Sequence, residues 1–205
     1  MSTVIDLPAT FGHIDIYLFD QLLKGRITAR DRVLDAGCGS GRNLFYLMKM
    51  GCALSAVDTN PAAVAGVAEL AVELASGLPL ENFRVEPVEA LSFPDESFDV
   101  VISSAVLHFA HDDGHFDAMV RAMWRVLRPG GMLFARLAST VAIEGEIRPL
   151  GRNHFLLPDG SDRYLVTTEN LEQLTAALGG QLLDPLKTTV VDGQRSMTTW
   201  VVRKN

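Results

Sequence analysis

The sequence predicts an α/β fold, in which a doubly wound, mostly parallel sheet carries helices on both faces. Three observations lead to this prediction. A glycine-rich loop at residues 35–41 joins a buried strand to a helix. Short apolar strands then alternate with helical segments through most of the chain. Near the end, two extended runs are separated by Asp192-Gly193, which is a typical hairpin turn.

The composition is that of an ordinary globular protein. With 205 residues, 48% hydrophobic and 21% charged, the chain fits a single domain over residues 1–205. The net charge of -7 and the lack of a Lys/Arg run argue against nucleic acid as a partner. Two cysteines predict no disulfide framework. Without a secretory signal or a transmembrane-length apolar run, we expect a cytoplasmic chain with no membrane partner. The oligomeric state is left open.

An N-terminal helical segment is expected within residues 1–30, where it could cover the site. Apolar spacing predicts a helix over residues 15–24, and Gly25 would end it. His13, Asp15 and Tyr17 lie near the start of this helix. They are candidates for lining a substrate pocket, with a solvated face as the alternative.

The remaining elements follow in alternation. Pro61 suits the first position of a helix that Asn60 would cap, and Thr168 is the expected cap of the last helix. Residues 139–168 carry no clear period, which is typical of a functional lid. The candidates for meeting a substrate there are Arg136, Glu144, Arg148, Arg152, Asn153 and His154. We expect strands at residues 32–35, 52–57, 83–88, 98–104 and 132–137, helices at 42–50, 61–76, 114–127 and 169–178, and extended runs at 181–191 and 197–203.

The glycine loop predicts a cofactor site. Gly37, Gly39 and Gly41 can take positive φ and let a ligand approach the backbone, and the next helix offers unpaired N–H groups. A dinucleotide loop has the pattern G-x-G-x-x-G, but Arg42 stands at the place of its third glycine. This spacing disfavours an NAD-dependent oxidoreductase. Asp35 at the strand end would repel a pyrophosphate, whereas it suits the ammonium group of an amino acid.

Further candidates stand at other strand ends. Asp58 follows the second strand, where an acidic side chain can hold both ribose hydroxyls of an adenosine; a simple helix cap is the alternative. His108 follows the fourth strand and could act as a base or orient a nucleophile, unless it only packs. Cys38 is expected to fill the loop rather than to act as a nucleophile. The run 111–115 has metal-ligand residue types but is expected to be a loop and helix cap, so no metal site is predicted.

Three motifs resemble those of the class I S-adenosylmethionine-dependent methyltransferases. They are D-x-G-x-G-x-G at residues 35–41, F-P-D-E-S-F-D-V-V at 93–101 and L-R-P-G-G at 127–131, and the resemblance covers most of the chain. It implies a Rossmann-like, seven-stranded sheet with an antiparallel C-terminal hairpin strand. It also implies S-adenosyl-L-methionine as cofactor and S-adenosyl-L-homocysteine as product. The cofactor contacts that it assigns are Asp35, Gly37, Cys38, Gly39, Asn43, Asp58, Thr59, Val88, Glu89 and Ser104.

The resemblance has one departure. Many relatives hold the adenine amine with an Asp after strand three, where this chain has Pro87 or Val88. The backbone of Val88 or Glu89, or the Glu89 carboxylate, would have to serve instead. The expected activity is methyl transfer to a small-molecule acceptor, with His108, Tyr17 and His13 as catalytic candidates. A non-catalytic module that binds S-adenosylmethionine or S-adenosylhomocysteine is the alternative.

Overall fold

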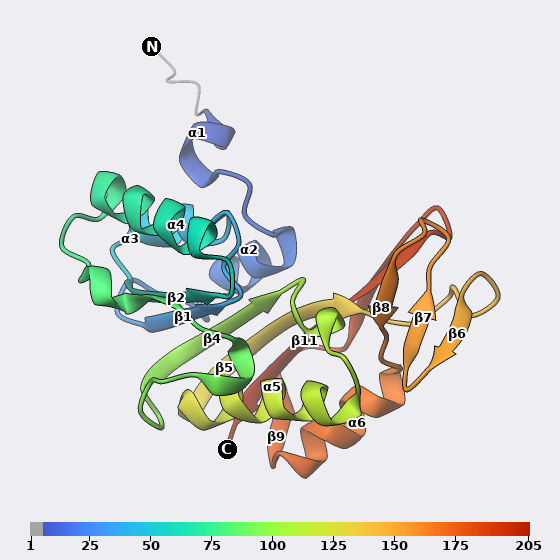
Figure 1. Ribbon diagram of the computed structural model, residues 1–205. Helices are drawn as coiled ribbons and strands as arrows, with labels where there is room; N and C mark the ends of the chain where they lie inside the picture. Colours follow the sequence, from blue (N-terminus) through green and yellow to red (C-terminus); the bar gives the residue numbers. More distant parts are fainter. Residues whose placement is uncertain (1–5) are drawn as a thin grey trace. The chain divides into compact units, whose positions relative to one another are not determined.

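The computed structural model describes residues 6–205, which form two compact units, residues 6–87 and residues 88–205. Each unit combines helices and β-strands (Figure 1). Within residues 6–205, no helix combines the length and the apolar character needed to cross a membrane.

The first unit has a parallel sheet in which β2 lies between β1 and β3. The pairing of β1 with β2 runs from Arg32 opposite Ala53 to Ala36 opposite Val57. The short β3 pairs with the end of β2. Figure 1 shows α3 and α4 side by side over one face of β1 and β2. The elements are α1 Leu7–Phe11, α2 Ile16–Leu23, β1 Arg32–Ala36, α3 Leu44–Met50, β2 Ala53–Asp58, α4 Pro61–Leu74, a 3₁₀ turn Leu80–Asn82 and β3 Phe83–Val85.

Local chemistry explains these boundaries. The Asn60 side chain accepts the N–H of Ala62 at 3.0 Å and Pro61 takes the first helical position, as the sequence predicts. Gly51 ends α3 in the left-handed conformation, with φ 82°. The middle of β1 and β2 is buried, which fits apolar strands covered on both faces.

The second unit has a mixed sheet in the order β10–β11–β5–β4, with β9 also paired to β11. Strand β5 is parallel to β4 and antiparallel to β11, and β10 forms a hairpin with β11. Figure 1 shows α5 along β5 and a separate small sheet of β6, β7 and β8. The elements are 3₁₀ turn Val88–Ala90, β4 Phe98–Ser104, 3₁₀ turn Leu107–Phe109, α5 Asp113–Val126, β5 Leu127–Ala138, β6 Arg148–Gly151, β7 His154–Leu156, β8 Asp162–Tyr164, α6 Thr168–Ala177, β9 Gly180–Leu182, β10 Lys187–Val191 and β11 Arg195–Lys204.

The central strands of this unit form its core. Ile102, Phe134 and Trp200 are fully buried on β4, β5 and β11. The indole Nε1 of Trp200 donates to the Thr175 hydroxyl of α6 at 2.8 Å, which satisfies its only polar atom. The hairpin turn is confirmed, because Asp192 and Gly193 both have positive φ, 49° and 65°, as a type I′ turn requires.

Several expectations are wrong in detail. The third strand ends at Val85 rather than at residue 88, since the chain goes into a 3₁₀ turn at Val88–Ala90. The last helix is capped by Thr167, not Thr168, in a reciprocal capping box with Asn170. The segment 127–131 is part of β5, because Leu127 already pairs with Phe98. Residues 139–168 are not irregular, since they contain the small sheet β6–β7–β8.

Candidate functional site

The glycine loop has the backbone that the sequence predicts. Gly37, Gly39 and Gly41 all have positive φ, at 89°, 50° and 74°. The N–H groups of Gly37 and Cys38 both donate to the Val57 carbonyl at 2.9 Å. The loop therefore folds back onto the end of β2. A Cβ on Gly39 would meet nothing within 4 Å, so this part of the backbone is open to a ligand.

Asp35, at the end of β1, is a buried carboxylate without a hydrogen-bond partner. It is 1% exposed, and within the described chain neither carboxylate oxygen has a partner. Burial raises its pKa to about 7; Arg42 opposes this shift and Asp58 adds to it. A buried, unpaired carboxylate is costly unless a cation binds to it. Asp35 is therefore suited to a positively charged group.

Asp58, at the end of β2, is directly connected to the glycine loop. Its Oδ2 accepts the N–H of Gly39 and its Oδ1 accepts the N–H of Asn60, both at 2.9 Å. The side chain is partly exposed, and Thr59 beside it is exposed. Each carboxylate oxygen keeps a further lone pair for a ligand. Asp58 thus accepts a hydrogen bond from the N-cap residue of α4 and is also a candidate for binding hydroxyls of a ligand.

Cys38 and Cys52 are buried free thiols. Burial raises the pKa of Cys38 to about 12, and the carboxylates of Asp35 and Asp58 add to the shift. Burial also raises the pKa of Cys52, to about 11. A thiol must ionise to act as a nucleophile, so the raised pKa disfavours a nucleophilic Cys38.

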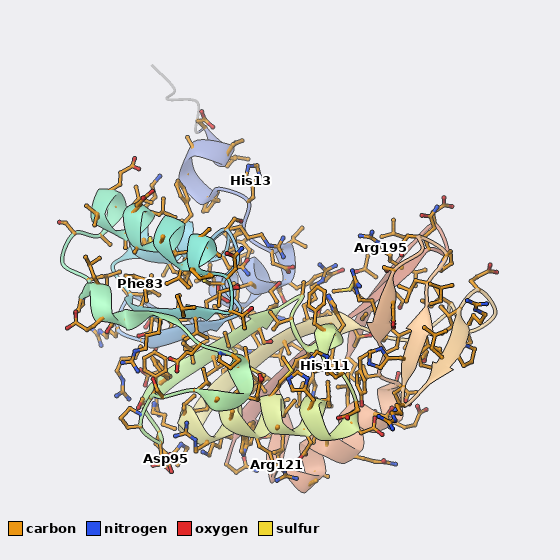
Figure 2. All side chains as sticks on the ribbon, viewed as in Figure 1. His13, Phe83, Asp95, His111, Arg121 and Arg195 are labelled. Carbon is orange, nitrogen blue, oxygen red and sulfur yellow. The ribbon has the colours of Figure 1, made fainter. Side chains whose placement is uncertain are left out.

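The N-terminal segment contacts the end of the glycine loop. The side-chain Oδ1 of Asn43 accepts the N–H of the buried Asp15 at 3.0 Å, and Arg42 lies 3.6 Å from the Asp15 carboxylate. Asn43 therefore anchors the start of α2. The N–H of Tyr17 donates to Asp15, while His13 is exposed between α1 and α2 (Figure 2). The structure brings Asn43 to the loop but leaves His13 in solvent.

The predicted residues of the second unit are spread over three segments. Val88 is buried and Glu89 exposed in the 3₁₀ turn, where the Glu89 carboxylate lies 3.3 Å from His115 Nε2. Ser104 ends β4. His115 lies in the first turn of α5, whose N-cap is Asp112, so the run 111–115 is a loop and cap as expected. Within residues 6–205, no group of three His, Cys, Asp or Glu side chains could hold a metal ion.

His108 lies in a cavity at the carboxyl ends of β4 and β5. The cavity volume is about 270 Å³. Ala105, directly after β4, has φ 64°, a strained conformation for a residue with a Cβ. His108 is 8% exposed and its Nδ1 has no hydrogen-bond partner in the described chain. Burial lowers its pKa to about 4, and Arg163 and Arg195 add to the shift. The polar lining consists of His108, Arg136, Ser161, Arg163, Arg195 and Ser196.

The sequence indicates only His108 and Arg136 as candidates in this cavity. Arg163 and Arg195 also line it, from β8 and the start of β11, together with Ser161. Arg195 lies two residues after the predicted hairpin turn Asp192-Gly193, which gives a weak signal for its position. Nothing in the sequence around Arg163 shows that its side chain lines the same cavity as residues at the ends of β4 and β5.

We expect Gly41→Ala to destabilise the first unit more than Gly39→Ala does. Both glycines have positive φ, but a Cβ on Gly41 would lie 2.9 Å from Val67 Cγ2. Strain and overpacking together predict a loss of about 2 to 4 kcal/mol for Gly41→Ala, and strain alone about 1 kcal/mol for Gly39→Ala. Urea unfolding of the two variants measures the difference. Equal losses would show that the contact with Val67 does not matter.

Comparison with known proteins places these features in a family. Residues 34–135 match the family model described as a methyltransferase domain. The chain is 29% identical over 157 residues to a ubiquinone biosynthesis O-methyltransferase of Rhizobium etli (strain CIAT 652), a match that covers 75% of this chain and 61% of the relative. The chain thus spans less than two thirds of that relative's length.

Solved structures share the fold. A Burkholderia thailandensis 1,6-didemethyltoxoflavin-N1-methyltransferase, solved with bound 1,6-didemethyltoxoflavin and S-adenosylhomocysteine, matches 98% of this chain and 81% of its own, with TM-score 0.71 and 20% identity. The [4+2]-cyclase SpnF matches 91% of this chain and 79% of its own, with TM-score 0.68 and 19% identity. The Rossmann-like fold class is therefore confirmed, and it also occurs in a protein named for another reaction.

Proposed function

We propose that this chain, which belongs to the class I S-adenosylmethionine-dependent methyltransferase family, transfers a methyl group from S-adenosyl-L-methionine to a small-molecule acceptor and releases S-adenosyl-L-homocysteine. The relative and the structural neighbour named as methyltransferases support this reaction class. The residues of the chain itself have to fit the cofactor as well.

The observation that carries the proposal is the Asp35 carboxylate. It is buried and has no partner in the described chain, so it suits the ammonium group of the methionine portion. Gly39 leaves open space at the loop, and Asp58 beside it can accept hydrogen bonds from ribose hydroxyls. The residues therefore fit the cofactor. Contacts at Val88, Glu89 and Ser104 stay predictions from the sequence.

The chemistry needs little from the protein beyond positioning. When bound, S-adenosylmethionine supplies an electrophilic sulfonium methyl group. Asp35 and Asp58 would fix two separate parts of the cofactor, and holding reactants in place can account for much of a rate enhancement. A dedicated base is therefore optional.

His108 is better suited to orienting an acceptor than to taking its proton. A pKa near 4 keeps the imidazole neutral at neutral pH and makes it a weak base. Its buried Nδ1 has no partner in the described chain, so it is available for a hydrogen bond to a ligand in the cavity. We propose a small molecule rather than nucleic acid as acceptor, which the net charge of -7 also favours.

A module that binds the cofactor without transferring its methyl group is the second candidate. One fold can host different reactions, as the structural match to a protein named as a cyclase illustrates. Calorimetric titration with S-adenosylmethionine, S-adenosylhomocysteine and NAD tests the cofactor. Binding of both adenosyl ligands without NAD is expected. Formation of S-adenosylhomocysteine with added acceptors then separates enzyme from binding module.

Asp58→Ala is expected to weaken S-adenosylmethionine binding by about 100-fold or more. The loss of two hydrogen bonds from a charged acceptor corresponds to about 3 kcal/mol or more. Glu73→Ala, at an exposed position on α4, is the matched control and should bind as the parent does. Thermal unfolding of both variants checks that they are folded. Unchanged affinity in a folded Asp58→Ala variant would refute the assignment of the ribose to Asp58.

A further inference from the structure

The cavity that holds His108 is small and polar on one side. Its volume of about 270 Å³ is just below the ~300 to 1,000 Å³ of sites for drug-sized ligands, so its occupant must be a small molecule or a small part of one. Ala138, Leu157 and Met197 form its apolar side. These three residues belong to a cluster that packs the small sheet against β5 and β11, so the wall is part of the core.

Positive charge dominates the polar side. Arg136 comes from β5, Arg163 from β8 and Arg195 from β11, and all three line the cavity (Figure 2 labels Arg195). The lining residues of the described chain include no Asp or Glu. Three guanidinium groups around one small volume repel one another, and an anion between them would relieve this repulsion. The cavity therefore has the charge of an anion site in a chain whose net charge is -7.

Arg163 has no carboxylate partner in the described chain. Its Nη1 donates to the backbone carbonyl of Asp162 at 2.6 Å. The guanidinium carbon lies 4.9 Å from the centre of the Phe109 ring, which is a cation–π contact. The neighbouring Asp162 carboxylate is bound instead to His154. The charge of Arg163 is thus fixed in place and not neutralised.

Arg195 and Ser161 are positioned by one carboxylate beside the cavity. Asp159 accepts hydrogen bonds from the N–H and the hydroxyl of Ser161, at 2.9 and 2.6 Å, and from Nε of Arg195. These bonds, those of Ser161 above all, lower the pKa of Asp159 to about 2, so its carboxylate stays ionised beside Arg195. Among residues 6–205, the remaining guanidinium donors of Arg195 have no hydrogen-bond partner and can bind a ligand.

We propose that this cavity recognises the anionic group of a small acceptor, a carboxylate or another oxyanion, through Arg136, Arg163 and Arg195. The planar guanidinium group matches such anions with paired hydrogen bonds. The proposal rests on the proposed function, since it names the chemical class of the acceptor. The anion is the group by which the acceptor is held, and His108 is the neutral side chain that meets the bound molecule next to it.

His108 also provides a direct readout. Arg163 and Arg195 help to lower the pKa of its imidazole. An anion bound between these arginines would offset them and raise the pKa of His108, while a neutral molecule would not. NMR titration of the imidazole signals reports this pKa, and His108→Gln identifies the signal that belongs to His108.

The test uses the full chain with benzoate, its neutral analogue benzamide, and inorganic phosphate as probes at low ionic strength. We expect benzoate or phosphate to bind and to raise the pKa of His108, and benzamide to do neither. Arg163→Gln should weaken this binding by about tenfold or more. Arg148→Gln is the control, because Arg148 is exposed on β6 and does not line the cavity. Comparing the binding of benzoate with that of phosphate shows which kind of anion the cavity prefers.

The outcomes are distinct. No binding by either anion, or equal losses in Arg163→Gln and Arg148→Gln, would overturn the proposal. S-adenosylhomocysteine is titrated into the same preparation. Adenosyl binding without anion binding would refute the anion site alone, whereas anion binding without adenosyl binding would refute the proposed function and leave the cavity as an anion site.

Discussion

Asp35→Asn is expected to stabilise the ligand-free chain by about 4 kcal/mol near pH 8 and to leave it unchanged near pH 4. Burial raises the pKa of Asp35 from 3.8 to about 7. Between these values the folded chain holds a proton that the unfolded chain has released, so the free energy of unfolding falls as pH rises. Above pH 7 the whole cost of the buried carboxylate is present, about 1.4 kcal/mol for each pKa unit. Asparagine cannot ionise, so the variant does not carry this cost.

Urea unfolding across this pH range measures the effect. Glu73→Gln, at an exposed position, should gain no such stability. If Asp35→Asn and the parent showed parallel pH profiles, the buried carboxylate would not carry the expected cost.

The same carboxylate couples cofactor binding to proton release. An ammonium group at Asp35 favours the ionised form and lowers its pKa. Near pH 6, one unit below the pKa of about 7, binding of S-adenosylmethionine should release about 0.9 proton. Calorimetry in buffers of different ionisation enthalpy measures this number. Asp35→Asn should release none and should bind far more weakly, which is the cost in function of its greater stability.

His108→Gln is expected to show the opposite pH dependence. Burial lowers the pKa of His108 from 6.5 to about 4, so between these values the unfolded chain takes up a proton that the folded chain does not hold. Stability therefore falls as pH is lowered through this range, by about 3 kcal/mol in all. Glutamine removes this loss. The free energy of unfolding of the variant, compared with that of the parent, should therefore be about 3 kcal/mol higher near pH 4 than near pH 8.

The control for this variant is His13→Gln, because His13 is exposed. Urea unfolding of the full chain at several pH values gives the comparison. A constant difference between His108→Gln and the parent at every pH would mean that the imidazole titrates normally in the folded state.

Much of the first unit follows from the sequence. The glycine loop was predicted because its three glycines come directly after a buried strand, and their φ values of 89°, 50° and 74° confirm the expected backbone. The positions of Asn60 and Pro61 likewise follow from local capping chemistry. What the sequence does not reveal is the state of Asp35, since its raised pKa depends on burial by residues distant in the chain.

Residues 139–168 show where such prediction fails. Strands β7 and β8 have three residues each, which is too short for a clear alternation of apolar and polar side chains. Their place is fixed instead by antiparallel pairing, from His154 opposite Tyr164 to Leu156 opposite Asp162. The capping residue of α6 was predicted one position too late, because both Thr167 and Thr168 can act as caps.

The sequence by itself determined the family motifs, the order of strands and helices from α2 to β5, and the acidic residues at the ends of β1 and β2. These features depend on neighbouring residues, whose spacing is visible in the chain. Only the tertiary structure brought Arg136, Arg163 and Arg195 around one cavity. They lie on three strands that meet through sheet pairing and core packing, and long-range contacts of this kind leave no local pattern in a single sequence.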